Sequence, residues 1–143
     1  MLSGENKLHI KQKENNLSKQ LKNAVRNLFY SSETDAPVEL FTGTVTDAVT
    51  HENLLSQIGK ADNTPLEMKN FDEFFAKLTA IQDWFGDEEK STAEKFTNLR
   101  DLLKKNLKDL NVFKVGSVEI EIFVVGLDNE SRLLGIKTKS VET

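Results

Sequence analysis

The change of hydrophobic period in the last third of the chain constrains its fold more than any other feature. Residues 118–125 alternate with a period of two, which predicts a β-strand. The alternation becomes wholly apolar at Phe123–Val125, so that end of the strand should be covered on both faces. Asp128-Asn129-Glu130 is turn material, and Leu133–Ser140 returns as a second strand. The pattern predicts an antiparallel hairpin that needs helices to cover its apolar faces.

Four stretches upstream carry apolar residues at helical spacing. They are residues 17–29, 50–59, 70–78 and 91–110. Thr50 is a suitable cap for the second helix. Asn70 with Glu73 predicts the start of the third helix, and Ser91 with Glu94 the start of the fourth.

Shorter strands are expected over residues 38–45, 64–69 and 112–115, with Gly43 as a possible bulge in the first and Pro65 placing the second at an edge. A chain of 143 residues fits one domain. We therefore expect a single α+β domain, a three-layer α/β/α sandwich on a largely antiparallel sheet. Residues 1–16 should form a mobile polar tail, and residues 17–143 the folded domain.

The composition bounds the class of protein. The chain has no cysteine, which excludes a disulfide framework and thiol chemistry. No apolar run approaches the roughly 20 residues that a membrane span needs, and the amino-terminal stretch lacks the apolar core of a secretory signal. These features predict a soluble, cytoplasmic protein that does not bind membranes.

The charge is concentrated in the middle of the chain. Residues 28–94 contain fourteen acidic and four basic residues, a net charge of −10. Such a field repels nucleic acid and attracts basic partners, so no direct binding to nucleic acid is expected. An acidic surface retained only for solubility remains the alternative.

Signals of catalysis are poor. The only histidines, His9 and His51, have no paired spacing for a metal site, and no glycine-rich phosphate loop or nucleophile elbow is present. Asp87-Glu88-Glu89 is explained by the start of a helix, where acidic residues are favourable. We expect no catalytic residue, no cofactor and no enzymatic activity, with an enzyme built on a carboxylate pair as the weakest alternative.

Two acidic segments have both a structural and a functional interpretation. The single tryptophan lies in an acidic connection between two predicted helices, within Gln82, Asp83 and Trp84. Its indole is either a core anchor for this loop or an exposed binding anchor. Glu33 follows the first predicted helix, and is either a solvated loop carboxylate or a contact to a partner.

Several stretches together resemble the nuclease A inhibitor family. They are Leu28–Glu33, Pro37–Phe41, Gln82–Glu89, Val118–Gly126 and Leu133–Thr143. The resemblance runs from about residue 17 to the end, and is most specific in the Gln-Asp-Trp segment, the last strands and the terminal Val-Glu-Thr. It implies an α/β/α sandwich that is a monomer when free. It also implies tight one-to-one inhibition of a sugar-non-specific, Mg-dependent nuclease of the ββα-metal type.

The resemblance also implies which residues bind the nuclease. In this family a loop glutamate meets arginines of the nuclease active site, which corresponds here to Glu33, and the Gln-Asp-Trp loop contacts the nuclease. The terminal threonine reaches the partner's catalytic magnesium in the complex, which corresponds to Thr143, with Glu142 beside it in the interface.

One departure from the family pattern affects the first of these residues. An extra residue just before Pro37 leaves Ser32 and Thr34 as alternatives to Glu33 in the register.

The implied chemistry is that of a substrate mimic. Arginines that bind a scissile phosphate accept a carboxylate in its place, and Mg²⁺ prefers hard oxygen ligands. The alternative function is a non-inhibitory interaction or adaptor module that has kept the fold.

Overall fold

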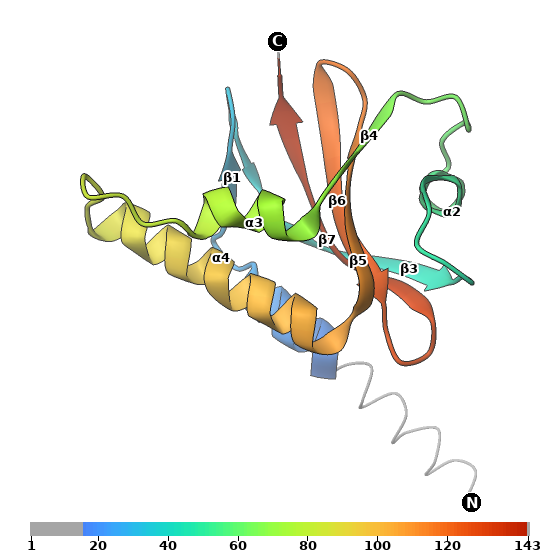
Figure 1. The fold of residues 1–143 in the computed structure, drawn as a ribbon, viewed down its shortest axis with the longest axis horizontal. Helices are drawn as coiled ribbons and strands as arrows, with labels where there is room; N and C mark the ends of the chain where they lie inside the picture. The colour runs from blue at the N-terminus through green and yellow to red at the C-terminus, as the bar shows by residue number, and fades with distance from the viewer. Residues whose placement is uncertain (1–15, 143) are drawn as a thin grey trace, which may run out of the picture.

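An antiparallel five-stranded sheet with the order β3-β7-β6-β5-β4 organises the protein (Figure 1). The computed structural model describes residues 16–142. The strands are β3 (Glu39–Val45), β4 (Leu66–Lys69), β5 (Lys108–Val115), β6 (Glu119–Leu127) and β7 (Arg132–Val141). The predicted single α+β domain on an antiparallel sheet is confirmed. Of the expected tail, residues 1–15 lie outside the described residues and residue 16 is helical. Thr143 also lies outside the described residues.

The β6–β7 hairpin forms as predicted, with Val124 opposite Ile136. Successive residues of β6 enter different cores. Ile122 and Val124 belong to one apolar cluster, while Phe123 and Val125 belong to another on the opposite face. The prediction that this strand is covered on both faces is therefore confirmed.

The two faces of the sheet are covered unequally. A helix over residues 16–24, together with α3 (Phe71–Thr79) and α4 (Asp87–Asn106), packs on one face. The other face carries the seven-residue α2 (His51–Gln57), which buries Leu54 and Leu55 (Figure 1). No helix within residues 16–142 combines the length and apolar character needed to cross a membrane.

Local capping signals fix the starts of two helices as expected. The Thr50 hydroxyl accepts a hydrogen bond from the Asn53 N–H at 3.1 Å at the start of α2. The Asn70 side chain accepts from the Glu73 N–H at 3.0 Å at the start of α3. Both caps satisfy backbone donors that the first helical turn leaves open.

The predicted start of α4 at Ser91 is wrong, because the helix begins at Asp87. The Glu89 carboxylate accepts a hydrogen bond from the Gly86 N–H at 3.0 Å, so Glu89 closes the helix start in place of Glu94. The acidic residues Asp87, Glu88 and Glu89 thus form the first turn, where they face the positive end of the helix dipole.

Two predicted helix ends are also wrong. The first helix stops at residue 24, and Asn27 at φ 55° turns the chain into β1 (Phe29–Ser31). This strand pairs with β2 (Asp35–Pro37) in a small hairpin that the sequence pattern did not indicate. At the end of α4 the helix stops at Asn106, so residue 110 lies in β5.

The bulge expected at Gly43 is present in β3, whose register with β7 shifts between Thr42 and Val45. Beside it, the Gln57 side chain from α2 bonds to both backbone groups of Thr44, at 2.8 Å to the N–H and 3.2 Å to the carbonyl. The outer strand of the sheet is therefore joined to the α2 layer at this point.

Candidate functional site

The tip of the β1–β2 hairpin is held against the end of β7. The Ser32 hydroxyl accepts a hydrogen bond from the Val141 N–H at 3.1 Å. Within the tip, the Ser32 N–H donates to the Thr34 carbonyl at 2.9 Å, and the Ser31 hydroxyl donates to the Asp35 carboxylate at 2.8 Å. Glu33, which is exposed, is thus presented by a short ordered turn next to the end of the last strand.

Glu142 is bound on several sides by the chain itself. Its N–H donates to the Val118 carbonyl at 3.0 Å. Its carboxylate accepts from the Ser140 hydroxyl at 2.9 Å and pairs with the Lys114 ammonium at 2.7 Å. The hydrogen bond from Lys114, followed by that from Ser140, holds the pKa of the Glu142 carboxyl below its usual value. Glu142 is therefore a carboxylate at neutral pH.

The sequence pattern gives no sign of a special role for Lys114. This lysine lies in β5 opposite Ile122, and its side chain is only 14% exposed. Lysine is seldom covered to this degree without a charged partner, but the partner is 28 positions away in the sequence. Only the strand order brings β5 and the end of β7 within reach of each other.

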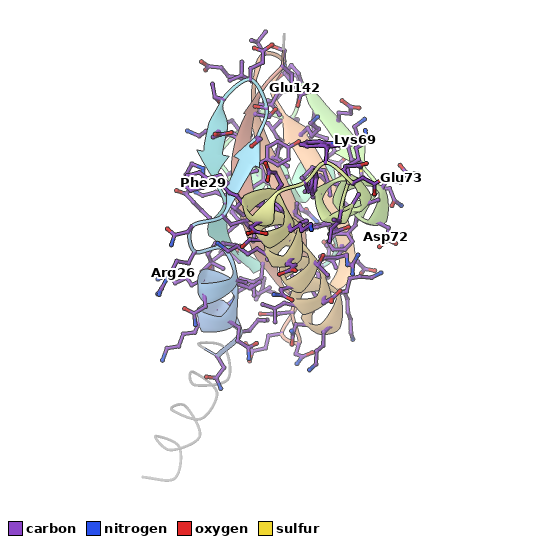
Figure 2. The ribbon with its side chains drawn as sticks, turned by 90° about the vertical axis from the view of Figure 1, so that its left-hand side faces the viewer. Arg26, Phe29, Lys69, Asp72, Glu73 and Glu142 are labelled. Carbon is purple, nitrogen blue, oxygen red and sulfur yellow. The ribbon has the colours of Figure 1, made fainter. Side chains whose placement is uncertain are left out.

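A cleft of about 260 Å³ lies next to Lys114, between β1, β4, β5 and α3. Tyr30 and Phe74 both line this cleft and stack with ring centroids 5.9 Å apart, which fixes the hairpin to α3. Burial raises the pKa of the Tyr30 hydroxyl. In Figure 2 Glu142 lies at the upper end of this side of the molecule, with Lys69 and Glu73 below it. The hairpin, α3 and the end of β7 thus form one packed unit.

The loop between α3 and α4 presents the tryptophan to solvent. Trp84 is 75% exposed, and its ring makes an edge contact with Phe85 at 4.7 Å between centroids. Gln82 and Asp83 are exposed in the same turn, which the Phe85 N–H closes by donating to the Gln82 carbonyl at 3.0 Å. The interpretation of Trp84 as a core anchor is wrong.

The described candidate residues thus fall into two groups on the molecule. Glu33 and Glu142 come together where the hairpin tip meets the end of β7. Figure 1 places the loop with Gln82, Asp83 and Trp84 at the far end of the helical layer, beyond α3. Within residues 16–142 no group of three or more His, Cys, Asp or Glu side chains is arranged to hold a metal ion.

Comparison with known proteins identifies the family. No curated protein matches the chain. A family model described as nuclease A inhibitor-like protein matches residues 15–143, which is nearly the whole sequence. The match covers the hairpin tip, the tryptophan loop and the end of the chain. This protein belongs to the nuclease A inhibitor-like family.

Proposed function

We propose that this protein inhibits a sugar-non-specific, Mg²⁺-dependent nuclease by occupying its active site in a one-to-one complex. Family membership suggests an inhibitor rather than an enzyme, with a nuclease as its partner. The observation that best supports the mechanism is the hydrogen bond between the Ser32 hydroxyl and the Val141 N–H. It joins the Glu33 turn to the end of the chain, so that both can enter one active site.

Glu33 is the proposed mimic of the scissile phosphate. Arginines that bind a phosphate accept a carboxylate with similar geometry, often through two parallel hydrogen bonds. Glu33 lies at the tip of a hairpin that is tied to β7 and stacked on α3, so little of its backbone has to become ordered on binding.

Thr143 is the proposed group that approaches the partner's magnesium. A terminal threonine offers a hydroxyl and a free carboxylate, and both are hard oxygen ligands of the kind that Mg²⁺ prefers. Neither contains a phosphodiester that could be cleaved. Thr143 directly follows Glu142, which hydrogen bonds and an ion pair hold in the fold.

Gln82, Asp83 and Trp84 form the proposed second contact. A tryptophan residue that is 75% exposed carries a large apolar area into an interface, and tryptophan is enriched among residues that dominate binding energy. Gln82 and Asp83 can form hydrogen bonds with polar groups of the partner around the indole. Separation of this loop from the hairpin tip then makes the interface broad rather than a single point.

Removal of Thr143 tests this mechanism. DNA cleavage by a purified ββα-metal nuclease is measured with increasing amounts of the full chain and of a chain ending at Glu142. We expect the full chain to inhibit and the shortened chain to inhibit at least about tenfold less, or about 1.4 kcal/mol. Asp62→Asn is the control, because it removes an exposed carboxylate from the loop after α2.

The outcomes separate the possible functions. Equal inhibition by both chains would exclude the proposed role of Thr143. Absence of inhibition by the full chain, together with unimpaired folding, would favour the non-inhibitory interaction module.

A further inference from the structure

We infer that Lys114 is a positioning residue of the inhibitory surface, which fixes the end of the chain beside the hairpin tip through its ion pair with Glu142. This inference rests on the proposed function. It assigns a role to a β5 residue that does not itself touch the nuclease. It also assigns the Glu142 carboxylate to contacts within the protein, with Lys114 and Ser140, rather than to the partner.

The geometry that supports this role is a set of contacts that we call the C-terminal anchor, formed by Ser32, Lys114, Ser140 and Glu142. Lys114 and the Ser140 hydroxyl both reach the Oε2 atom of Glu142, at 2.7 and 2.9 Å. The Ser32 hydroxyl accepts a hydrogen bond at 3.1 Å from the N–H of Val141, the residue before Glu142. The last two described residues are thus bound by the hairpin tip, by β5 and by β7.

Burial distinguishes Lys114 from the other lysines of the same cleft. Its side chain is 14% exposed, whereas that of Lys69 is 46% exposed and pairs with Glu67 at 2.6 Å. Lys77, on α3, also lines the cleft and is exposed. A largely covered ammonium needs a close partner, and the Glu142 carboxylate at 2.7 Å is such a partner for Lys114. The Glu142 side chain is the more exposed of the pair, at 39%.

The anchor affects binding through preorganisation. A chain end that is free to move loses conformational entropy when a partner fixes it, and this loss reduces affinity. In this protein the N–H and the carboxylate of Glu142 already have partners within the chain. Lys114 therefore contributes to inhibition by restricting the conformations of the chain end at Glu142 before the nuclease binds.

The first test compares Lys114→Met with Lys77→Met, which removes a positive charge from the same cleft without breaking the anchor. We expect Lys114→Met to weaken nuclease inhibition at least about tenfold and Lys77→Met to change it by less than about twofold. Both substitutions are repeated in a chain that ends at Val141. There Lys114→Met should have no further effect, because the residue it positions is missing.

The second test does not depend on the nuclease. Amide hydrogen exchange of Val141 and Glu142 should become about tenfold faster in Lys114→Met, and should be unchanged in Lys77→Met. Glu142→Gln, at the end of the chain, should increase the exchange of the same amides. Because Glu142→Gln removes the other charge of the same ion pair, it tests the anchor if Lys114→Met does not fold.

Each outcome is decisive. Unchanged exchange in both anchor variants would overturn the inference. An equal loss of inhibition in the full and shortened chains would also overturn it, because Lys114 would then contact the nuclease directly. Faster exchange in a protein whose unmodified form inhibits no ββα-metal nuclease would support the anchor and refute the proposed function.

Discussion

Replacement of Trp84 by alanine separates the contribution of the indole to binding from its contribution to folding. A tryptophan side chain offers up to about 250 Å² of surface, and apolar burial contributes about 25 cal/mol per Å². Because Trp84 is 75% exposed, folding covers only about a quarter of its surface, which limits the loss of stability to roughly 1.5 kcal/mol. The exposed remainder could contribute roughly 5 kcal/mol before the costs of association are subtracted.

We therefore expect Trp84→Ala to weaken nuclease binding by about 2–4 kcal/mol, or roughly 30-fold to 1,000-fold in Kd. Titration calorimetry measures the affinity, and thermal unfolding measures the stability. Val45→Ala is the control, because Val45 is an apolar side chain that is 66% exposed on β3. A binding loss below about 0.5 kcal/mol, or a loss of stability larger than that of binding, would refute the reasoning.

Three further substitutions test other parts of the structure. Glu33→Ala should weaken binding by about 2 kcal/mol or more with an unchanged circular dichroism spectrum, and a collapsed spectrum would make Glu33 structural. Because Lys114 lowers the folded-state pKa of Glu142, the stabilisation is complete above the usual value of 4.5 and is lost as the pH falls through the folded-state pKa. Thermal unfolding between pH 7 and pH 2.5 should thus show Glu142→Gln less stable at neutral pH and equal to the original in acid, and a pH-independent difference would contradict the ion pair. Gly135→Ala should destabilise by about 3 kcal/mol in urea unfolding, because its Cβ would collide with the Val124 carbonyl, and an unchanged midpoint would show that β6 and β7 can separate locally.

Features set by neighbouring residues were predictable from the sequence. The β6–β7 hairpin follows from a period of two on either side of a turn, and the caps at Thr50 and Asn70 need only a side chain three residues before a free N–H. The predicted start of α4 at Ser91 was wrong, although it rested on the same kind of capping signal. Ser91–Glu94 and Gly86–Glu89 both have the required spacing, and the second forms.

Features set by distant pairing were not predictable. The strands β1 and β2 have three residues each, too few for a periodic pattern, and the helical spacing of the preceding segment extends into β1 at Phe29. Lys114 gives no local sign of a partner in Glu142. The exposure of Trp84 depended on where α3 and α4 end and begin, so the sequence left both interpretations open.

The contact between Gln57 and Thr44 has a consequence for how this protein behaves beside copies of itself. β3 is an outer strand, and its backbone groups would otherwise be open to a strand from another molecule. The Gln57 amide occupies a donor and an acceptor on that strand, next to a bulge that already bends it. The Gln57 side chain thus leaves fewer free backbone groups on this edge strand, which disfavours the edge-to-edge strand pairing that leads to aggregation.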